Sequence, residues 1–316
     1  MKKIRNSITA LTRAALLTTA LLVTSLPTLP AAADEDPEEY PTDASPVGID
    51  PSGQPLEWAP DAAEAAAPSD SEESIPGYKP ESIESAGTTS LGAQDGRVHF
   101  TDTTAYPNSA IVYISKDGKP FCTGWMVSAD TLVTAGHCVY NYDREEWLSD
   151  LEYSPGANGP ERPFETATAV QTWTDVSWVK KENPLLDWGL VKLDKRLGER
   201  TGWFGLAWRS GEYTDTQTEL RGYPADKDQG ELWGMSGKVE SSQGNQLCYS
   251  MDTYPAQSGS PLYMADGAFV IGIHAYGKAQ TRFTRRECSP NYNAGTRITK
   301  GLFELILDLR SRADTE

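Results

Sequence analysis

Histidine is scarce in this chain, and so are basic residues and long apolar runs. Only three histidines are present, His99, His137 and His274, so any chemistry that needs an imidazole must use one of them. The formal net charge is −17, which argues against a nucleic-acid partner because such partners need a basic face. Beyond the N-terminus no apolar stretch is long enough to cross a bilayer, so we expect no membrane association of the mature chain.

Residues 1–33 have the pattern of a secretory signal peptide. Basic residues precede an apolar run from Ala14 to about Leu29, and the run ends in Ala31-Ala-Ala33. Small residues at this place predict cleavage after Ala33. A membrane anchor is the alternative, but the run is short and is interrupted by Thr, Ser and Pro27. We therefore expect a secreted, extracellular protein.

Cysteine is rare as well, with four residues in 316, at Cys122, Cys138, Cys248 and Cys288. No Cys-x-x-Cys pair is present, which makes a structural zinc site a poor interpretation. In an exported chain an even number of cysteines favours disulfides, and four cysteines allow three pairings. We expect no metal and no cofactor.

Residues 34–89 differ in composition from the rest of the chain. They hold 15 acidic residues and one basic residue, Lys79, with much Ala, Ser and Pro and no sustained period. Such a stretch cannot bury enough apolar surface to offset its ordering entropy, so we predict a largely disordered segment. It is either a linker or a propeptide that is removed from the mature protein.

From Ser90 onward the pattern changes to short runs rich in Val, Ile, Thr, Tyr and Trp, separated by Gly, Pro, Asn and Asp. Many short strands at close spacing predict an all-β fold, a sandwich or a barrel. One clear helix is predicted at the C-terminus, over about residues 299–312, because apolar residues recur there at helical spacing. These residues are Leu302, Phe303, Leu305, Ile306 and Leu309.

A nucleophile is suggested by Ser258 in the stretch Tyr254-Pro-Ala-Gln-Ser-Gly-Ser-Pro261. Small neighbours allow a substrate carbonyl to approach the serine and the N–H groups around it, although a plain surface turn has the same composition. His137 follows an apolar run in Thr131-Leu-Val-Thr-Ala-Gly-His-Cys138, and Asp187 interrupts an apolar strand over 185–193. A buried carboxylate needs a partner, and the order His, Asp, Ser is that of chymotrypsin-type enzymes.

Several short motifs together resemble those of trypsin-like serine proteases, and more narrowly those of the bacterial glutamyl endopeptidases. The matching motifs, in chain order from about residue 90, are Asp102-Thr-Thr-Ala-Tyr-Pro107, Cys122-Thr-Gly-Trp-Met126, Thr134-Ala-Gly-His-Cys138, Asp187-Trp-Gly-Leu-Val191, Gly222-Tyr-Pro224, Met251-Asp-Thr-Tyr254, Gln257-Ser-Gly-Ser-Pro261 and Gly295-Thr-Arg-Ile-Thr-Lys300. The resemblance implies one chymotrypsin-like double β-barrel over residues 90–316, with His137 and Asp187 on the first barrel and Ser258 on the second. Because it starts near Ser90, it favours the propeptide interpretation of residues 34–89.

The resemblance also implies roles for individual residues. Ser258 is expected to attack the scissile carbonyl, His137 to act as general base and Asp187 to orient the imidazole. The N–H groups of Ala256 and Ser258 would form the oxyanion hole, although the family usually has glycine at the position of Ala256. Family members have the bridge Cys122–Cys138, and Cys248–Cys288 is then the remaining pair.

Substrate specificity is expected from two further positions. In the glutamyl endopeptidases a histidine and a hydroxyl residue bind the substrate carboxylate, and they match His274 and Thr253 here. This predicts cleavage after Glu, with Asp weaker. A rival is Asp252, which by simple counting occupies the position that selects Arg and Lys in trypsin.

Two other classes of function compete with a monomeric secreted endopeptidase that acts on protein or peptide substrates. A non-catalytic binding protein on the same fold is one, although such proteins usually lack a triad residue. An esterase is the other, but the nucleophile motif is not Gly-x-Ser-x-Gly and it lies among strands. The mature N-terminus is a further open point, because a glutamate-specific enzyme that cuts itself would prefer Glu84–Ser85 to a start at Ser90.

Overall fold

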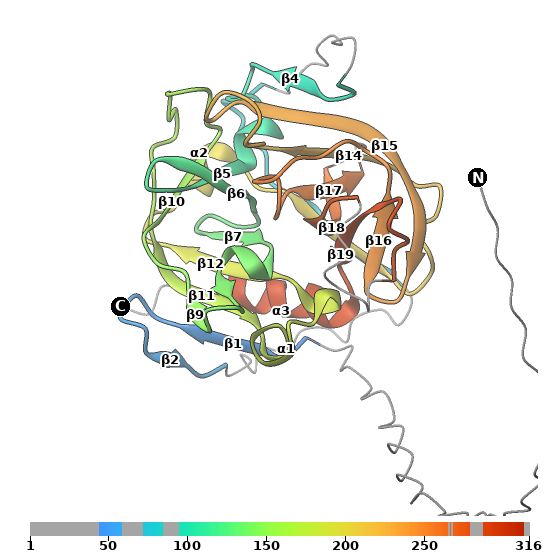
Figure 1. The fold of residues 1–316 in the computed structure, drawn as a ribbon. Coiled ribbons are helices and arrows are strands. Elements are labelled where there is room, and N and C mark those ends of the chain that lie inside the picture. Colours follow the sequence, from blue (N-terminus) through green and yellow to red (C-terminus); the bar gives the residue numbers. More distant parts are fainter. Residues whose placement is uncertain are drawn as a thin grey trace, which may run out of the picture. The chain divides into compact units, whose positions relative to one another are not determined.

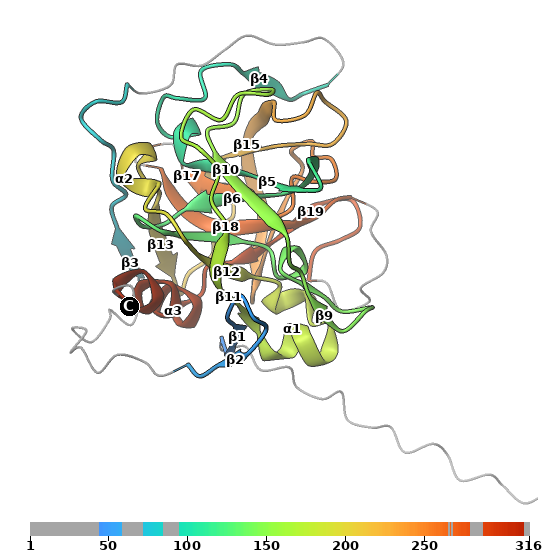
Figure 2. The same cartoon turned by 90° about the vertical axis from the view of Figure 1, so that its left-hand side faces the viewer.

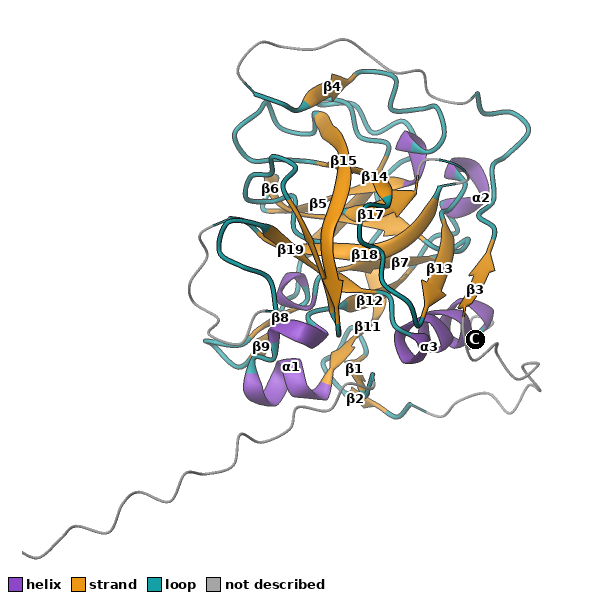
Figure 3. Ribbon diagram, turned by 90° about the vertical axis from the view of Figure 1, so that its right-hand side faces the viewer, coloured by secondary structure: helices purple, strands orange, loops and turns teal. Residues whose placement is uncertain are grey.

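The structure is a computed structural model of the chain, and it describes residues 44–58, 72–84, 95–264, 266, 268–278 and 287–312. The predicted signal peptide and the chain around Ser90 lie outside these ranges. The described residues all belong to one unit, Tyr40–Glu316, in which strands predominate (Figure 3). Among them, no helix combines the length and the apolar character that a membrane span requires.

Eight strands form the first sheet, in the spatial order β10-β5-β6-β7-β12-β11-β1-β2 (Figure 1). In chain order these strands are β1 (Pro46–Ile49), β2 (Pro55–Leu56), β5 (Ile111–Lys116), β6 (Lys119–Met126), β7 (Thr131–Thr134), β10 (Leu151–Pro155), β11 (Ala169–Asp175) and β12 (Gly189–Leu193). β5, β7 and β12 are buried almost throughout, as expected of short apolar runs that line a barrel. The turn between β5 and β6 uses Asp117 and Gly118, whose φ angles of 51° and 71° suit a two-residue hairpin.

The second sheet closes on itself. Its order is β17-β14-β15-β16-β19-β18-β13-β3, and an additional pairing of β17 with β18 completes the ring. Its strands are β3 (Glu72–Ile75), β13 (Gly205–Arg209), β14 (Gln217–Gly222), β15 (Leu232–Gln243), β16 (Gln246–Tyr249), β17 (Pro261–Met264), β18 (Phe269–Tyr276) and β19 (Asn293–Arg297), with β4 (Val98–Phe100) paired to β15. The two β-barrels confirm the chymotrypsin-like fold predicted from the motifs.

Helices are few and short apart from the last one. The predicted C-terminal helix is confirmed as α3 (Lys300–Ser311), whose N-cap Thr299 accepts a hydrogen bond from the N–H of Leu302. Its buried face is the apolar set identified in the sequence. The other short elements are η1 (Asn108–Ala110), η2 (Gly136–Cys138), α1 (Val176–Lys181), η3 (Pro184–Leu186), α2 (Gly198–Thr201) and a small pairing of β8 (Tyr140–Asn141) with β9 (Glu146–Trp147).

Part of the acidic stretch is ordered, which the sequence did not predict. β1 pairs with β11, the edge of the first sheet, and β3 pairs with β13, the edge of the second (Figure 2). Trp58 packs against Trp173 in a T-shaped, edge-to-face arrangement, with 5.0 Å between ring centroids. The expectation of disorder is corrected for residues 44–58 and 72–84, because edge strands supply the backbone partners that this composition cannot supply itself.

Both expected disulfides are present. Cys122–Cys138 joins β6 to η2, and Cys248–Cys288 joins β16 to the segment before β19. The first closes a loop with a sequence separation of 16, and a closure of this size stabilises a fold by about 3 kcal/mol in the chain-entropy model. It also fixes η2, which carries His137, to the strand beside it.

Candidate active site

His137 and Asp187 are joined directly by hydrogen bonds. His137 lies in η2, just after β7, and its Nδ1 atom is 2.8 Å from Oδ2 of Asp187. The main-chain N–H of His137 donates to Oδ1 of the same carboxylate at 2.8 Å. Because both carboxylate oxygens are engaged by one residue, the imidazole has a single orientation relative to the carboxylate. The imidazole side chain is 30% exposed whereas Asp187 is fully buried.

Asp187 is not inside a strand, as the sequence suggested, but at the end of η3, two residues before β12. Pro184 starts this turn, and the side chain of Asn183 accepts from the N–H of Leu185. The turn brings the carboxylate against Gly136, where a Cβ atom would lie only 2.9 Å from Oδ1 of Asp187. Glycine in the Ala-Gly-His-Cys motif is therefore needed for this close approach.

The ionisation of the pair follows from burial and from contacts. Burial alone would raise the pKa of Asp187, but the charge of His137 and hydrogen bonds from His137 and Tyr276 outweigh it and hold this pKa below its ordinary value. Burial alone would lower the pKa of His137, but the charge and hydrogen bond of Asp187 outweigh that effect and raise it. The pair therefore consists of a stable carboxylate and a more basic imidazole.

Ser258 belongs to the second barrel, and within the described residues its hydroxyl makes no hydrogen bond with His137. It lies in the loop between β16 and β17, and its carbonyl accepts from the N–H of Thr123 at 2.8 Å, next to the Cys122–Cys138 bridge. The Oγ atom of Ser258 is 3.5 Å from the carbonyl oxygen of Ala275 on β18. The neighbour of Ala275, Tyr276, stacks on the ring of His137 at 6.1 Å between centroids. Ser258 is therefore linked to His137 through their neighbours, because Tyr276 contacts the imidazole and the Sγ atom of Cys138 lies 3.7 Å from the carbonyl oxygen of Ser258.

Ala256 has an unusual backbone conformation, with a φ of 76°. The carbonyl of Pro255 accepts from the N–H of Ala225 at 2.8 Å, and the carbonyl of Ala256 accepts from Oγ1 of Thr123 at 2.9 Å. These bonds fix the peptide planes on both sides of Ala256. Within the described parts of the chain, the N–H groups of Ala256 and Ser258 donate to no protein acceptor. Two such donors beside a serine are free to bind an anion.

His274 is buried on β18, with 3% of its surface exposed, and its Nδ1 atom is 2.5 Å from the hydroxyl of Tyr249 on β16. When the tyrosine hydroxyl donates to Nδ1, a neutral imidazole carries its proton on Nε2 and presents a donor there. Nothing in the sequence pointed to Tyr249, because its contact depends on how β16 and β18 pack across β19.

The two other specificity candidates differ in their surroundings. Thr253 is half-buried, and in the described part of the chain its hydroxyl makes no hydrogen bond with His274. Asp252 has a side chain that is 50% exposed, with one oxygen 3.5 Å from Nζ of Lys278 and the other 3.3 Å from the N–H of Gly96. A selector for Arg or Lys would need a buried, unpaired carboxylate at the base of a pocket.

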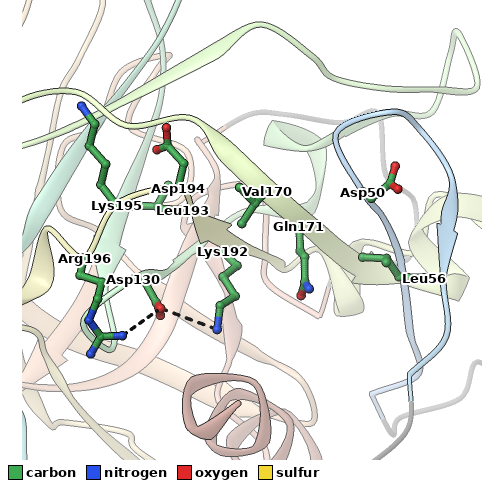
Figure 4. A pocket seen from close by; sticks show the side chains of 10 residues that line it. All are labelled: Asp50, Leu56, Asp130, Val170, Gln171, Lys192, Leu193, Asp194, Lys195 and Arg196. Atoms are coloured by element: carbon green, nitrogen blue, oxygen red, sulfur yellow. Dashed lines mark hydrogen bonds and ion pairs between the residues drawn. The ribbon is translucent and has the colours of Figure 1, made fainter. Parts of the chain in front are cut away.

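A separate pocket of about 470 Å³ lies where the β1–β2 hairpin meets β12 (Figure 4). Asp50 and Leu56 line it from the hairpin, and Lys192 and Arg196 lie on the opposite side, both within 4 Å of Asp130. Its lining includes no residue of the catalytic motifs. The charged groups that face one another are already paired, so this pocket offers no obvious ligand site.

The fold is that of chymotrypsin-like serine proteases, and the paired His137 and Asp187 lie on its first barrel with Ser258 on the second. A family model described as Trypsin matches residues 97–291. The glutamyl endopeptidase of Bacillus licheniformis is 33% identical over 249 residues, covering 77% of this chain and 74% of that protein. The chain therefore belongs to the trypsin family, and it is a serine endopeptidase related to the glutamyl endopeptidases.

Other relatives agree with this assignment. The glutamyl endopeptidase of Staphylococcus aureus strain MW2 is 27% identical over 187 residues, covering 56% of this chain and 54% of that protein. A solved structure of a Glu endopeptidase in complex with MPD superposes with a TM-score of 0.63 at 25% identity, over 69% of this chain and 98% of that chain.

One relative has a name from another class. The protein of Bacillus subtilis called extracellular metalloprotease is 31% identical over 233 residues, which is 71% of each chain. In the described residues of the present chain, the one group of three potential metal ligands consists of Cys122, His137 and Cys138. Both of these sulfurs are committed to a disulfide, so this group is not a metal site.

Proposed function

We propose that the mature protein is a secreted endopeptidase that hydrolyses peptide bonds after glutamate through His137, Asp187 and Ser258. The observation that carries the proposal is the double hydrogen bond between His137 and the fully buried Asp187. A buried carboxylate that orients an imidazole next to an accessible serine is the constellation that activates a serine hydroxyl.

In this mechanism Ser258 attacks the scissile carbonyl while His137 accepts its proton at Nε2. Asp187 stabilises the imidazolium that forms, and His137 then returns the proton to the leaving amine. The N–H groups of Ala256 and Ser258 bind the oxyanion of the tetrahedral intermediate, and the loss of one such donor typically costs about 3–4 kcal/mol of transition-state stabilisation. Water repeats the sequence on the acyl-enzyme.

Specificity for glutamate rests on His274, with Thr253 as the second donor. The hydrogen bond between the Tyr249 hydroxyl and Nδ1 supports this role, because a neutral imidazole that accepts at Nδ1 carries its proton on Nε2, and a charged acceptor strengthens a bond from such a donor. The relatives named glutamyl endopeptidase give independent support. The alternative through Asp252 is disfavoured by the exposure of its carboxylate and its pairing with Lys278.

We further propose that residues 1–33 are a signal peptide, that residues 34–89 are a propeptide, and that the mature monomer begins near Ser90. Two disulfides and a relative described as extracellular support export. The pairing of β1 and β3 with the two sheet edges suggests that the acidic stretch stabilises the precursor by adding strands. None of its described contacts is with the triad.

A set of peptides that differ only in the residue before the scissile bond tests the function. We expect hydrolysis to be fastest after Glu, weaker after Asp, and far weaker after Gln, Arg or Phe. Ser258→Ala and His137→Ala should each abolish hydrolysis while the protein remains folded. A preference for Arg would assign the pocket to Asp252, and wild-type turnover by Ser258→Ala would contradict the mechanism.

A further inference from the structure

Tyr276 contacts the catalytic pair from the opposite barrel. It is the last residue of β18, it is 3% exposed, and its hydroxyl is 2.5 Å from Oδ2 of Asp187. This is the same oxygen that receives the hydrogen bond from Nδ1 of His137.

A bulge in β18 explains how Tyr276 reaches this position. His274 is opposite Gly295 on β19, but Tyr276 is opposite Ala294, so Ala275 is an extra residue in the ladder. The bulge breaks the two-residue alternation of side chains. His274 consequently contacts Tyr249, whereas Tyr276 turns toward Asp187 and stacks over the ring of His137 with an interplanar angle of 29°.

We propose that Tyr276 is a positioning residue of the triad, whose hydroxyl donates to Asp187 and thereby both fixes the carboxylate and tempers the basicity of His137. The proposal rests on the peptidase function proposed above. Tyr276 touches neither substrate nor the transferred proton in it. The residue acts through Asp187, and its ring covers one face of the imidazole.

The physical effect follows from the donors around Asp187. Oδ1 accepts from the N–H of His137, and Oδ2 accepts from Nδ1 of His137 and from Tyr276. A second donor on Oδ2 removes part of the negative charge that would otherwise attract the imidazolium. With it, both oxygens of the carboxylate accept hydrogen bonds from buried donors. Rotation of Asp187 away from His137 would therefore leave buried polar groups unpaired.

Besides Asp187, the carboxylate of Glu182 at the C-terminal end of α1 acts on His137 and raises its pKa. Trp178 on the same helix is 6.2 Å from the imidazole between ring centroids and carries no charge. The hydroxyl of Tyr276 is the group on β18 that reaches the pair. A change in the titration of His137 on removal of this hydroxyl therefore reports on Asp187.

The test compares the Tyr276→Phe variant with the wild type, both expressed as the full chain and processed to the mature form. Phenylalanine keeps the ring and removes only the hydroxyl, so the carboxylate becomes a stronger attractor of the imidazolium. We expect kcat/KM at neutral pH to fall about tenfold to hundredfold, as for the loss of a hydrogen bond to a charged group. The acidic limb of the pH profile and the NMR titration of His137 should both move to higher pH, by about one unit.

Tyr263→Phe is the matched control, because the hydroxyl of this buried tyrosine is also bonded to a carboxylate, that of Glu219, at 3.0 Å. It should leave the titration of His137 unchanged. Incorporation of 3-fluorotyrosine at position 276 keeps the shape and makes the hydroxyl a stronger donor. It should move the titration of His137 to lower pH, the direction opposite to that of phenylalanine.

Three outcomes would overturn the proposal. They are an unchanged His137 titration in Tyr276→Phe, a shift of that titration to lower pH in Tyr276→Phe, and a shift in the same direction with 3-fluorotyrosine as with phenylalanine. The NMR titration does not need a substrate. A wild-type protein that cleaves no peptide and whose Ser258 resists a fluorophosphonate would refute the proposed function, while the titration would still decide the role of Tyr276.

Discussion

His137 presents two donors to one carboxylate, since its main-chain N–H and its Nδ1 atom each lie 2.8 Å from an oxygen of Asp187. Asparagine at position 187 would keep the shape but place an amide where the second oxygen is needed. The imidazole would then adopt the wrong tautomer. We expect Asp187→Asn to lower kcat by about 10⁴-fold, the magnitude known for the same change in a chymotrypsin-type triad.

The control for this change is Asp130→Asn, because Asp130 is also buried and paired, with Lys192 and Arg196, but lies outside the triad. It should lower the melting temperature and leave the kcat of the folded protein unchanged. Steady-state kinetics on a Glu-containing peptide, with thermal unfolding of each variant, make the comparison. Equal losses of kcat in both variants would contradict the assignment of Asp187.

The pH dependence of activity follows from the raised pKa of His137. Only the neutral imidazole can accept the proton of Ser258, so activity is lost as the pH falls through the pKa of His137. Because the charge of Asp187 raises this pKa, we expect the midpoint of the acidic limb of kcat/KM to lie above 6.5. Glu182→Gln removes a further negative charge and should lower the midpoint slightly. A wild-type midpoint below 6.5 would be inconsistent with the pair described here.

Specificity should depend on His274 and on the tyrosine that holds it. We expect His274→Ala to lower kcat/KM for Glu substrates by about 10²-fold or more, with a much smaller effect on Gln substrates. Tyr249→Phe should lower the Glu-to-Gln ratio less, by about tenfold, because the imidazole remains but loses its fixed tautomer. Asp252→Asn is the control and should leave the ratio unchanged. A ratio lost in Asp252→Asn instead would reassign the pocket.

The backbone at Ala256 allows a test of the oxyanion hole. Glycine adopts a φ of 76° without strain, whereas a β-branched residue does so rarely. Ala256→Gly should therefore keep or raise kcat, and Ala256→Val should lower it by about 10²-fold or more because the N–H turns away from the oxyanion. Single-turnover kinetics on an ester substrate separate the acylation step. Full activity of Ala256→Val would show that this N–H contributes nothing.

We expect the ordered part of the acidic stretch to stabilise the precursor. A Cβ atom at Gly77 would lie 2.3 Å from the carbonyl oxygen of Trp203, so Gly77→Ala must shift the chain that follows β3. We expect the precursor to lose about 1–3 kcal/mol of stability. Gly211→Ala is the control, because nothing lies within 4 Å of the added atom. Unfolding of the Ser258→Ala precursor avoids self-cleavage, and equal stability of the two glycine variants would contradict a stabilising role of β3.

Mass spectrometry of the secreted protein decides the mature N-terminus. We expect removal of residues 34–89 and a start near Ser90 or, after self-cleavage, at Ser85. The carbonyl of Glu84 accepts from the N–H of Tyr106 at 2.8 Å, which holds this bond against the body of the protein. Cleavage there should therefore be slower in the folded precursor than in a peptide of the same sequence. A fully active protein that retained Asp34 would disprove the propeptide.

The sequence by itself determined the all-β class and the C-terminal helix, and it singled out His137, Asp187 and Ser258 as the triad that we propose. Each depends on local information: short apolar runs between turn residues, the spacing of Leu302 to Leu309, and the small residues that flank His137 and Ser258. The cysteine positions and the family motifs were also sufficient for both disulfides. These features can be recognised in the sequence because each one depends on residues that are close together in the chain.

Only the tertiary structure revealed that Tyr249 contacts His274 and that Tyr276 contacts Asp187. Tyr276 and Asp187 are 89 residues apart, and their contact requires both a bulge at Ala275 and the packing of one barrel on the other. The strands in the acidic stretch were likewise hidden, because β1 and β3 form on the backbone groups of β11 and β13 rather than through a pattern of their own. Pairing with the edge of a sheet depends on the geometry of the partner strand. The hydrophobic periodicity of the pairing segment itself does not reveal it.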